Sequence, residues 1–379
     1  MEYKKINELT TVVTGGTPST RKNEYWDNGD IPWLQSGCCQ NCDVDSTEKY
    51  ITKEGYNNSS THMMSADTVM IALTGATAGK VGYLKFEACG NQSITGILPC
   101  ESLNQRYLFF YLLSQREKIL ADCVGGAQAH ISQSYVKNMT IPILAIKEQE
   151  QIVGELTKVS NIVSLRQEEI QQLDNLVKAR FVEMFGNPVT NEKGWKQRQL
   201  GEIATKIGSG ATPKGGKEAY QEEGITLIRS MNVHNGLFEY KELAHISEEQ
   251  AEKLDNVTIE ENDVLLNITG ASVARSCVVP SKILPARVNQ HVCIIRCNQC
   301  IVPEFLNKLL IDDNYQRLLW SIAEAGATRE AITKQQVESL QIIMPPIELQ
   351  EQFADFVHQV DKSKFDTMTF APILSLIHI

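Results

Sequence analysis

The sequence predicts two α/β domains of one shared fold, separated by a long coiled-coil helix. Three observations lead to this prediction. Five sequence blocks recur in the same order in both halves of the chain, a segment of helical periodicity lies between the halves, and 379 residues exceed the usual length of one domain. We expect the first domain at residues 1–146, the helix at 147–185 and the second domain at 186–345.

The repeat opens with an apolar segment that ends in a glycine-rich turn. KKINELTTVVTGGTP (4–18) corresponds to RQLGEIATKIGSGATP (198–213). Apolar residues recur at helical spacing before each turn: Ile6, Leu9 and Val13; Leu200, Ile203 and Ile207. GDIPWLQS (29–36) then matches EGITLIRS (223–230). We expect a short helix before each glycine-rich turn and a short buried strand in each of the latter blocks.

The remaining blocks follow in the same order. They are ADTVMIALTGATAGKVG (66–82) with ENDVLLNITGASVARSC (261–277), NQSI (91–94) with NQHV (289–292), and GGAQAHISQSYVKNMTIPI (125–143) with AGATREAITKQQVESLQIIM (325–344). In the first pair a β-rich run leads into a TGA turn. Because ordered blocks at a nearly constant offset do not arise by chance, the pattern indicates a duplication.

The segment from Lys147 to Gly186 contains no internal proline and predicts one helix. Its apolar residues follow a 4-3-4 spacing: Ile152, Leu156, Val159, Val163, Ile170, Leu173 and Val177. This spacing is typical of a coiled-coil seam of about four heptads. A long amphipathic helix packed on its own domains is the alternative. The helix would be roughly 58 Å long at 1.5 Å per residue.

A second helix is predicted at residues 346–366, where ELQEQFADFVHQVDKSK matches the start of the central helix. The heptad pattern then breaks in an anomalous apolar tail, residues 367–379, so this helix looks truncated in comparison with the first. The tail is either a real truncation or a run of non-native residues.

The charge and the cysteines limit the class of protein. The net charge is −10, but residues 1–146 carry 12 basic and 14 acidic side chains and residues 186–345 carry 17 and 20, so each half is nearly balanced. This argues against a basic nucleic-acid binder, although a local basic face or basic partner subunits could supply phosphate contacts. Neither a signal-peptide pattern nor a membrane-length apolar run occurs, so we expect a soluble cytoplasmic protein with reduced thiols. Two CxxC pairs, Cys39 with Cys42 and Cys297 with Cys300, leave a zinc site as the alternative to ordinary thiols.

The arrangement of two repeated domains, each followed by a helix, resembles the specificity subunit of Type I restriction-modification systems. TGGTPS ending at Ser19, YW at Tyr25 and Trp26, and IPW at 31–33 are similar to the opening of such target-recognition domains. FVEMFGNPVTNEKGW (181–195) is similar to the junction that follows the central helix.

The resemblance implies a non-catalytic DNA-binding subunit in which each domain reads one half of a bipartite double-stranded target. It also implies docking by the helices to two methyltransferase subunits, in a complex with two motor-nuclease subunits. Those partners would use S-adenosylmethionine, ATP and Mg²⁺, and this chain would hold no cofactor or metal itself.

Base reading requires Arg, Lys, Asn, Gln, Ser or Thr on loops, and the repeated turns carry such residues at corresponding positions. The candidates in the first domain are Arg21, Lys22, Gln35, Ser36, Thr77, Lys80, Asn91, Gln92, Gln128 and His130. Those in the second are Lys214, Lys217, Arg229, Ser230, Ser272, Arg275, Asn289, Gln290, Thr328 and Arg329. The alternative for each is a turn side chain that faces water. We expect His291 to be a structural histidine.

Two other functions compete with DNA reading. One is a coiled-coil scaffold that binds proteins and no DNA. The other is a nucleotide-binding enzyme, since GATAGK (75–80) and GATPKGGK (210–217) approach the spacing of a phosphate-binding loop. The first is one residue short, the second is one residue long, and neither lysine is followed by Ser or Thr. We therefore expect no ATP site.

Overall fold

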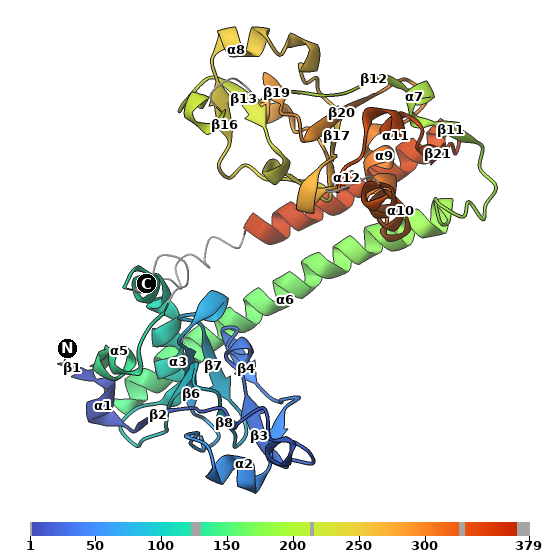
Figure 1. Cartoon of the computed structure of the whole chain (residues 1–379). Helices are drawn as coiled ribbons and strands as arrows, with labels where there is room; N and C mark the ends of the chain where they lie inside the picture. Colours follow the sequence, from blue (N-terminus) through green and yellow to red (C-terminus); the bar gives the residue numbers. More distant parts are fainter. Residues whose placement is uncertain (1, 123–129, 213–215, 326–329, 370–379) are drawn as a thin grey trace. The chain divides into compact units, whose positions relative to one another are not determined.

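The computed structural model describes residues 2–122, 130–212, 216–325 and 330–369 (Figure 1). Contacts divide the chain into two compact units, which meet within one helix between Gln167 and Glu168. The second unit ends at Thr367. Each unit is described by itself.

The first unit is built on a five-stranded sheet of order β2-β9-β6-β7-β4. These strands are Val12–Thr14 (β2), Ile94–Ile97 (β9), Val69–Ala72 (β6), Val81–Leu84 (β7) and Cys42–Val44 (β4). A second sheet has the order β5-β3-β8, with strands Tyr50–Ile51, Ile31–Leu34 and Cys89–Gly90. The first and last strands of the unit, β1 (Glu2–Lys5) and β10 (Thr140–Ile143), pair with each other.

The helices of the first unit cover one face of the five-stranded sheet. They are α1 (Ile6–Leu9), α3 (Gln105–Ser114), α4 (Arg116–Ala121) and α5 (Gln133–Asn138), while α2 (Lys53–Asn57) packs beside β5. Val69 and Ile71 of β6 pack in the same cluster as α3, whereas Met70 and Ala72 pack with Leu34 on the opposite face. Successive strand residues point to opposite faces, so β6 is buried on both.

The second unit repeats this order. Its main sheet is β12-β20-β17-β18, with strands Ala204–Ser209, Val292–Cys297, Val264–Asn267 and Ser276–Val278. The second sheet is β16-β13-β19, with strands Ala244–Ile246, Ile225–Ile228 and Ala286–Val288. β11 (Gln197–Gln199) pairs with β21 (Gln341–Ile343) as β1 pairs with β10. The helices are α7 (Leu200–Ile203), α8 (Glu248–Glu252), α9 (Pro303–Leu310), α10 (Asp313–Glu324) and α11 (Lys334–Glu338).

The repeated strand order confirms the prediction of two α/β domains of one fold. The units differ at one sheet edge. In the first, β4 adds a strand parallel to β7, whereas the second has a two-stranded hairpin, β14 (Val233–His234) with β15 (Leu237–Phe238). The predicted opening helix is shorter than expected, because α1 and α7 are single turns and Val13 and Ile207 lie in strands. The β-branched run from Thr10 to Val13 favours a strand over a second helical turn.

The predicted central helix is one continuous helix, α6 (Ile146–Phe185), of 40 residues and so about 60 Å long. At its two ends the predicted seam packs into the domain cores. Ile152 packs on the core of the first unit, and Leu173 and Val177 pack into that of the second. Ile162 and Leu165, which lie off the predicted seam, are 58% and 63% exposed.

In the second unit α6 packs against the C-terminal helix α12 (Ile347–Thr369). Phe353, near the start of α12, contacts Phe185 at the end of α6, while Lys364 pairs with Asp174 at 2.5 Å. These pairings make the two helices antiparallel over this stretch, and they confirm the coiled-coil prediction there. Of the predicted tail at residues 367–379, residues 367–369 belong to α12 and residues 370–379 lie outside the described residues.

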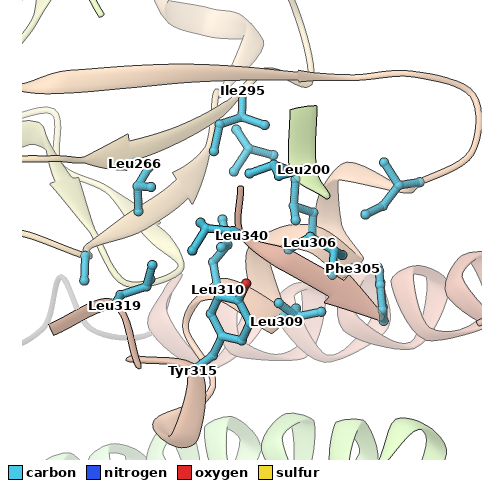
Figure 2. Packing of buried hydrophobic residues seen from close by; sticks show 14 of the residues in the cluster. Leu200, Leu266, Ile295, Phe305, Leu306, Leu309, Leu310, Tyr315, Leu319 and Leu340 are labelled. Carbon is cyan, nitrogen blue, oxygen red and sulfur yellow. The ribbon is translucent and has the colours of Figure 1, made fainter. Parts of the chain in front are cut away.

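The core of the second unit lies between its main sheet and the helices α9 to α12. Tyr315 is fully buried beside Leu309 and Leu310 (Figure 2). Its hydroxyl donates to the carbonyl of Gln341 at 3.1 Å. Burial raises the pKa of this phenol well above its usual value.

No helix among the described residues is long and apolar enough to cross a membrane.

An aromatic cluster joins α6, α9 and α12 in the second unit. The ring of Phe185 lies 5.2 Å from that of Phe181, 4.9 Å from that of Phe305 and 5.4 Å from that of Phe353, centroid to centroid. Such pairs stabilise a core beyond the area that they bury.

Phe185→Ala is expected to lower the free energy of unfolding of the second unit by about 3–5 kcal/mol, because it leaves a cavity where three helices meet. Val182→Ala on the same helix is the matched control, since Val182 is 49% exposed, and its effect should stay within about 0.5 kcal/mol. Urea denaturation followed by circular dichroism measures both. Equal effects of the two substitutions would contradict the central role of this cluster.

Candidate nucleic-acid interface

Four loops of the first unit meet at one end of its main sheet. They follow β2, β3 and β6 and precede β9, and strand register places these ends together, since Thr14 pairs with Thr95 and Ala72 with Ile94. The backbone links them further. Gly16 N donates to the carbonyl of Gly90 at 2.8 Å, and Asn91 N donates to that of Leu34 at 2.8 Å.

A fifth segment joins this loop cluster at His130. Thr74 forms a β-bridge with His130, and Ile131 N donates to the carbonyl of Leu73 at 2.9 Å. Leu73 N in turn donates to the carbonyl of Ser93 at 2.8 Å. The TGA turn, the NQS turn and the segment at His130 therefore lie side by side, although they are far apart in the sequence.

The second unit builds the same loop cluster from its own sequence. Gly210 N donates to the carbonyl of Asn289 at 3.1 Å, and Asn289 N donates to that of Ile228 at 3.0 Å. Ile268 N donates to the carbonyl of His291 at 3.0 Å, and Thr269 bridges to Ala331. The five blocks of the sequence repeat thus meet at equivalent places in both units.

Asn91 and Asn289 hold the turns of these loops. The side-chain oxygen of Asn91 accepts from Ser93 N at 3.1 Å, and that of Asn289 accepts from His291 N at 3.0 Å. The glutamines that follow them, Gln92 and Gln290, are exposed. Their side-chain oxygens accept from the hydroxyls of Thr17 and Thr212 respectively, and these bonds connect each glutamine to the glycine-rich turn.

Three of the predicted basic residues contact their own domain. Lys22 donates to the hydroxyl of Tyr25 at 2.9 Å and lies 3.4 Å from Glu24, and these hydrogen bonds, that with Tyr25 first, raise its pKa. Lys80 donates to the side chain of Gln40 at 2.6 Å. Arg229 donates to the carbonyl of Glu242, and its guanidinium lies 5.5 Å from the centre of the Tyr220 ring.

The other predicted residues divide by exposure. Arg21, Gln35 and His130 are exposed, whereas Ser36, Thr77, Ser230, Ser272 and Arg275 are half-buried. Arg275 follows Ala274, whose positive φ of 70° turns the chain at the TGA loop. Gln128, Lys214, Thr328 and Arg329 lie outside the described residues, as does the side chain of Lys217.

Aromatic residues beside the first loop cluster were not among the predicted site residues. A cavity of about 850 Å³ is lined by Trp26, Tyr50, Gln35 and Gln92. The YW pair at 25–26 follows the glycine-rich turn after five residues, and Trp26, which is half-buried at the cavity, was a usable signal of a binding surface.

In the first unit, residues 75–80 differ in structure from a phosphate-binding loop. A phosphate-binding loop needs a helix directly after it, whereas residues 75–80 lead into strand β7. In the second unit, residues 216 and 217 at the end of the corresponding segment begin a single 3₁₀ turn, Gly216–Ala219, and residues 213–215 lie outside the described residues. Among the described residues no group of three or more His, Cys, Asp or Glu side chains could hold a metal ion. Burial raises the pKa of the Cys297 thiol to about 12.

Comparison with known proteins identifies the family. The Type I restriction modification DNA specificity domain matches residues 1–175 and again residues 192–372. The chain belongs to this family. Membership confirms the prediction of a Type I specificity subunit, and with it the prediction that the chain is not itself the enzyme.

Two curated specificity subunits illustrate the relationship. The EcoR124I/EcoR124II specificity subunit of Escherichia coli is 32% identical over 169 residues, which are 43% of this chain and 42% of that protein. The MjaIX specificity subunit of Methanocaldococcus jannaschii is 23% identical over 378 residues, 94% of this chain and 85% of that protein. The crystal structure of the Type I S subunit from M. genitalium shares the fold, with a TM-score of 0.57 at 16% identity over 100% of this chain and 93% of that one.

The loop cluster of this Type I specificity chain requires glycine at one close approach. A Cβ added to Gly210 would lie 1.7 Å from the carbonyl oxygen of Val288, whereas one added to Gly208 would meet nothing within 4 Å. We expect Gly210→Ala to destabilise the second unit by about 1–3 kcal/mol, because the NQH turn must move. Gly208→Ala, two residues away, is the matched control and should leave the urea midpoint unchanged. Indistinguishable midpoints would contradict the close packing of these loops.

Proposed function

We propose that each loop cluster reads one half of a bipartite double-stranded DNA target. The observation that carries this proposal is a single loop scaffold that occurs twice with different side chains. Ser93 corresponds to His291, Lys80 to Arg275 and Gln35 to Arg229. Equal backbones with different hydrogen-bonding groups are what two readers of different base sequences require.

The helices α6 and α12 would dock the catalytic partners. α6 exposes several large apolar side chains that water disfavours: Ile162, Leu165, Leu176 and Val182. We propose that such faces bind two methyltransferase subunits, which supply S-adenosylmethionine chemistry, in a complex with two motor-nuclease subunits that use ATP and Mg²⁺. The net charge of −10 fits a complex in which the partner subunits are basic, because those subunits would then supply the contacts with DNA phosphates.

Arg275→Ala tests the assignment of one domain to one half-site. The variant should relax base preference at one position of one half-site by about 1–3 kcal/mol, because a lost base contact costs that much. Lys80→Ala, at the corresponding position of the first domain, is the matched variant and should affect the other half-site alone. Methylome sequencing of cells that express each variant with its partner subunits measures both. Equal changes in both half-sites would overturn the assignment, and a complex that binds no DNA would favour a protein scaffold.

The continuous helix α6 suggests that helix length sets the spacer between the half-sites. Inserting one heptad after Arg166 keeps the apolar seam and adds about 10 Å of helix, equivalent to roughly three base pairs. The two half-sites should keep their sequences while the unspecified spacer grows. A scrambled heptad with polar seam positions is the control for coil integrity. Altered half-site bases with an unchanged spacer would refute this role of the helix.

A further inference from the structure

We propose that His291 is a positioning residue for the second half-site, and that it fixes the amide of Gln290 in one orientation for base recognition. This inference rests on the proposed DNA-reading function of the loop clusters. From the sequence alone, His291 was expected to be only a structural histidine.

Three hydrogen bonds connect three loops of the second unit through these side chains. The hydroxyl of Thr212 donates to Gln290 Oε1, and Gln290 Nε2 lies 3.2 Å from His291 Nε2. His291 Nδ1 lies 2.5 Å from the hydroxyl oxygen of Thr269. The chain runs from the glycine-rich turn through the NQH turn to the TGA turn.

The chemistry of the groups determines the direction of each hydrogen bond. An amide nitrogen can only donate, so His291 Nε2 must be its acceptor. A neutral imidazole that accepts at Nε2 carries its proton on Nδ1, which then donates to Thr269. Gln290 is therefore held at both ends of its amide, with its oxygen toward Thr212 and its nitrogen toward His291.

The backbone fixes His291 in turn. Its N–H donates to the buried side chain of Asn289 at 3.0 Å, and its carbonyl accepts from Ile268 N at 3.0 Å. His291 is half-buried, whereas Gln290 is exposed. The held amide keeps one N–H and one oxygen lone pair unused, which is the pair that glutamine offers to the edge of adenine.

In the first unit the corresponding NQS turn has no histidine, and among the described residues its glutamine is held at one end only. Ser93 occupies the place of His291, and its hydroxyl accepts from Thr74 at 2.9 Å. Gln92 is held at its oxygen by Thr17, and within the described part of the unit Ser93 makes no hydrogen bond to its nitrogen. Holding both ends lowers the entropy that an amide loses on binding, so the second reader gains discrimination through His291.

Two substitutions separate the contacts of His291. The side-chain nitrogen of an asparagine can replace Nδ1 toward Thr269, but its side chain is too short to reach Gln290, whereas the oxygen of a glutamine can replace Nε2 as acceptor. His291→Asn thus keeps one contact and removes the other, and His291→Gln is the conservative rescue. Gln290→Ala removes the group that is positioned. Ser93→Ala in the first unit is the matched control.

The experiment uses the full chain in complex with its methyltransferase partners, on the target that methylome sequencing defines. Dissociation constants are measured for this target and for every single-base change in its second half-site. His291→Asn should reduce discrimination at one base pair about tenfold, to the level of Gln290→Ala, and the double variant should lose no more than Gln290→Ala alone. His291→Gln should restore discrimination, and Ser93→Ala should leave the second half-site unaffected.

A uniform loss of affinity for all sequences in His291→Asn, or additive losses in the double variant, would show a merely structural role and overturn the inference. Gln290→Ala with unchanged discrimination would also overturn it, while the proposed function would stand. A wild-type complex that binds every sequence equally would instead refute the proposed function itself.

Discussion

The antiparallel pairing of two buried central strands decides where the TGA turn and the NQ turn of each unit lie. In the first unit β6 pairs with β9 so that Ala72 faces Ile94, and in the second β17 pairs with β20 so that Asn267 faces Val292. These registers bring the turn after one strand beside the turn before the other. A slip by one residue would turn the core side chains of Val69 and Ile71 to the opposite face, so burial holds the register.

The loops depend on this pairing in a second way, because their side chains form hydrogen bonds across it. Thr74 binds Ser93 and Thr269 binds His291, each across the ends of one strand pair. A polar network of this kind is rigid only if its backbone is already in place. The scaffold can therefore stay constant while the side chains above it change, as they do between the two units of this chain.

Much of the fold could be predicted from the sequence, because duplication shows in repeated blocks and a coiled coil in its heptads. The exposed positions of Gln92 and Gln290 on their turns could be predicted from the sequence, whereas their contact with DNA stays a prediction. It was not predictable at Arg229, whose contacts with Glu242 and Tyr220 come from residues outside its own block. Local patterns report the backbone of a turn, but they do not report which distant carbonyl a long side chain will reach.

Each unit begins and ends in one ribbon. Glu2 pairs with Ile143 in the first unit, and Gln197 pairs with Ile343 in the second, so the chain enters and leaves a domain at the same place. A domain attached in this way is a cassette: a homologous segment with other loops can replace it without moving the chain on either side. Recombination that joins the first domain of one chain to the second domain of another would then bring two different loop clusters into one chain in a single step, as long as the incoming α9 still packs on Phe185 of α6.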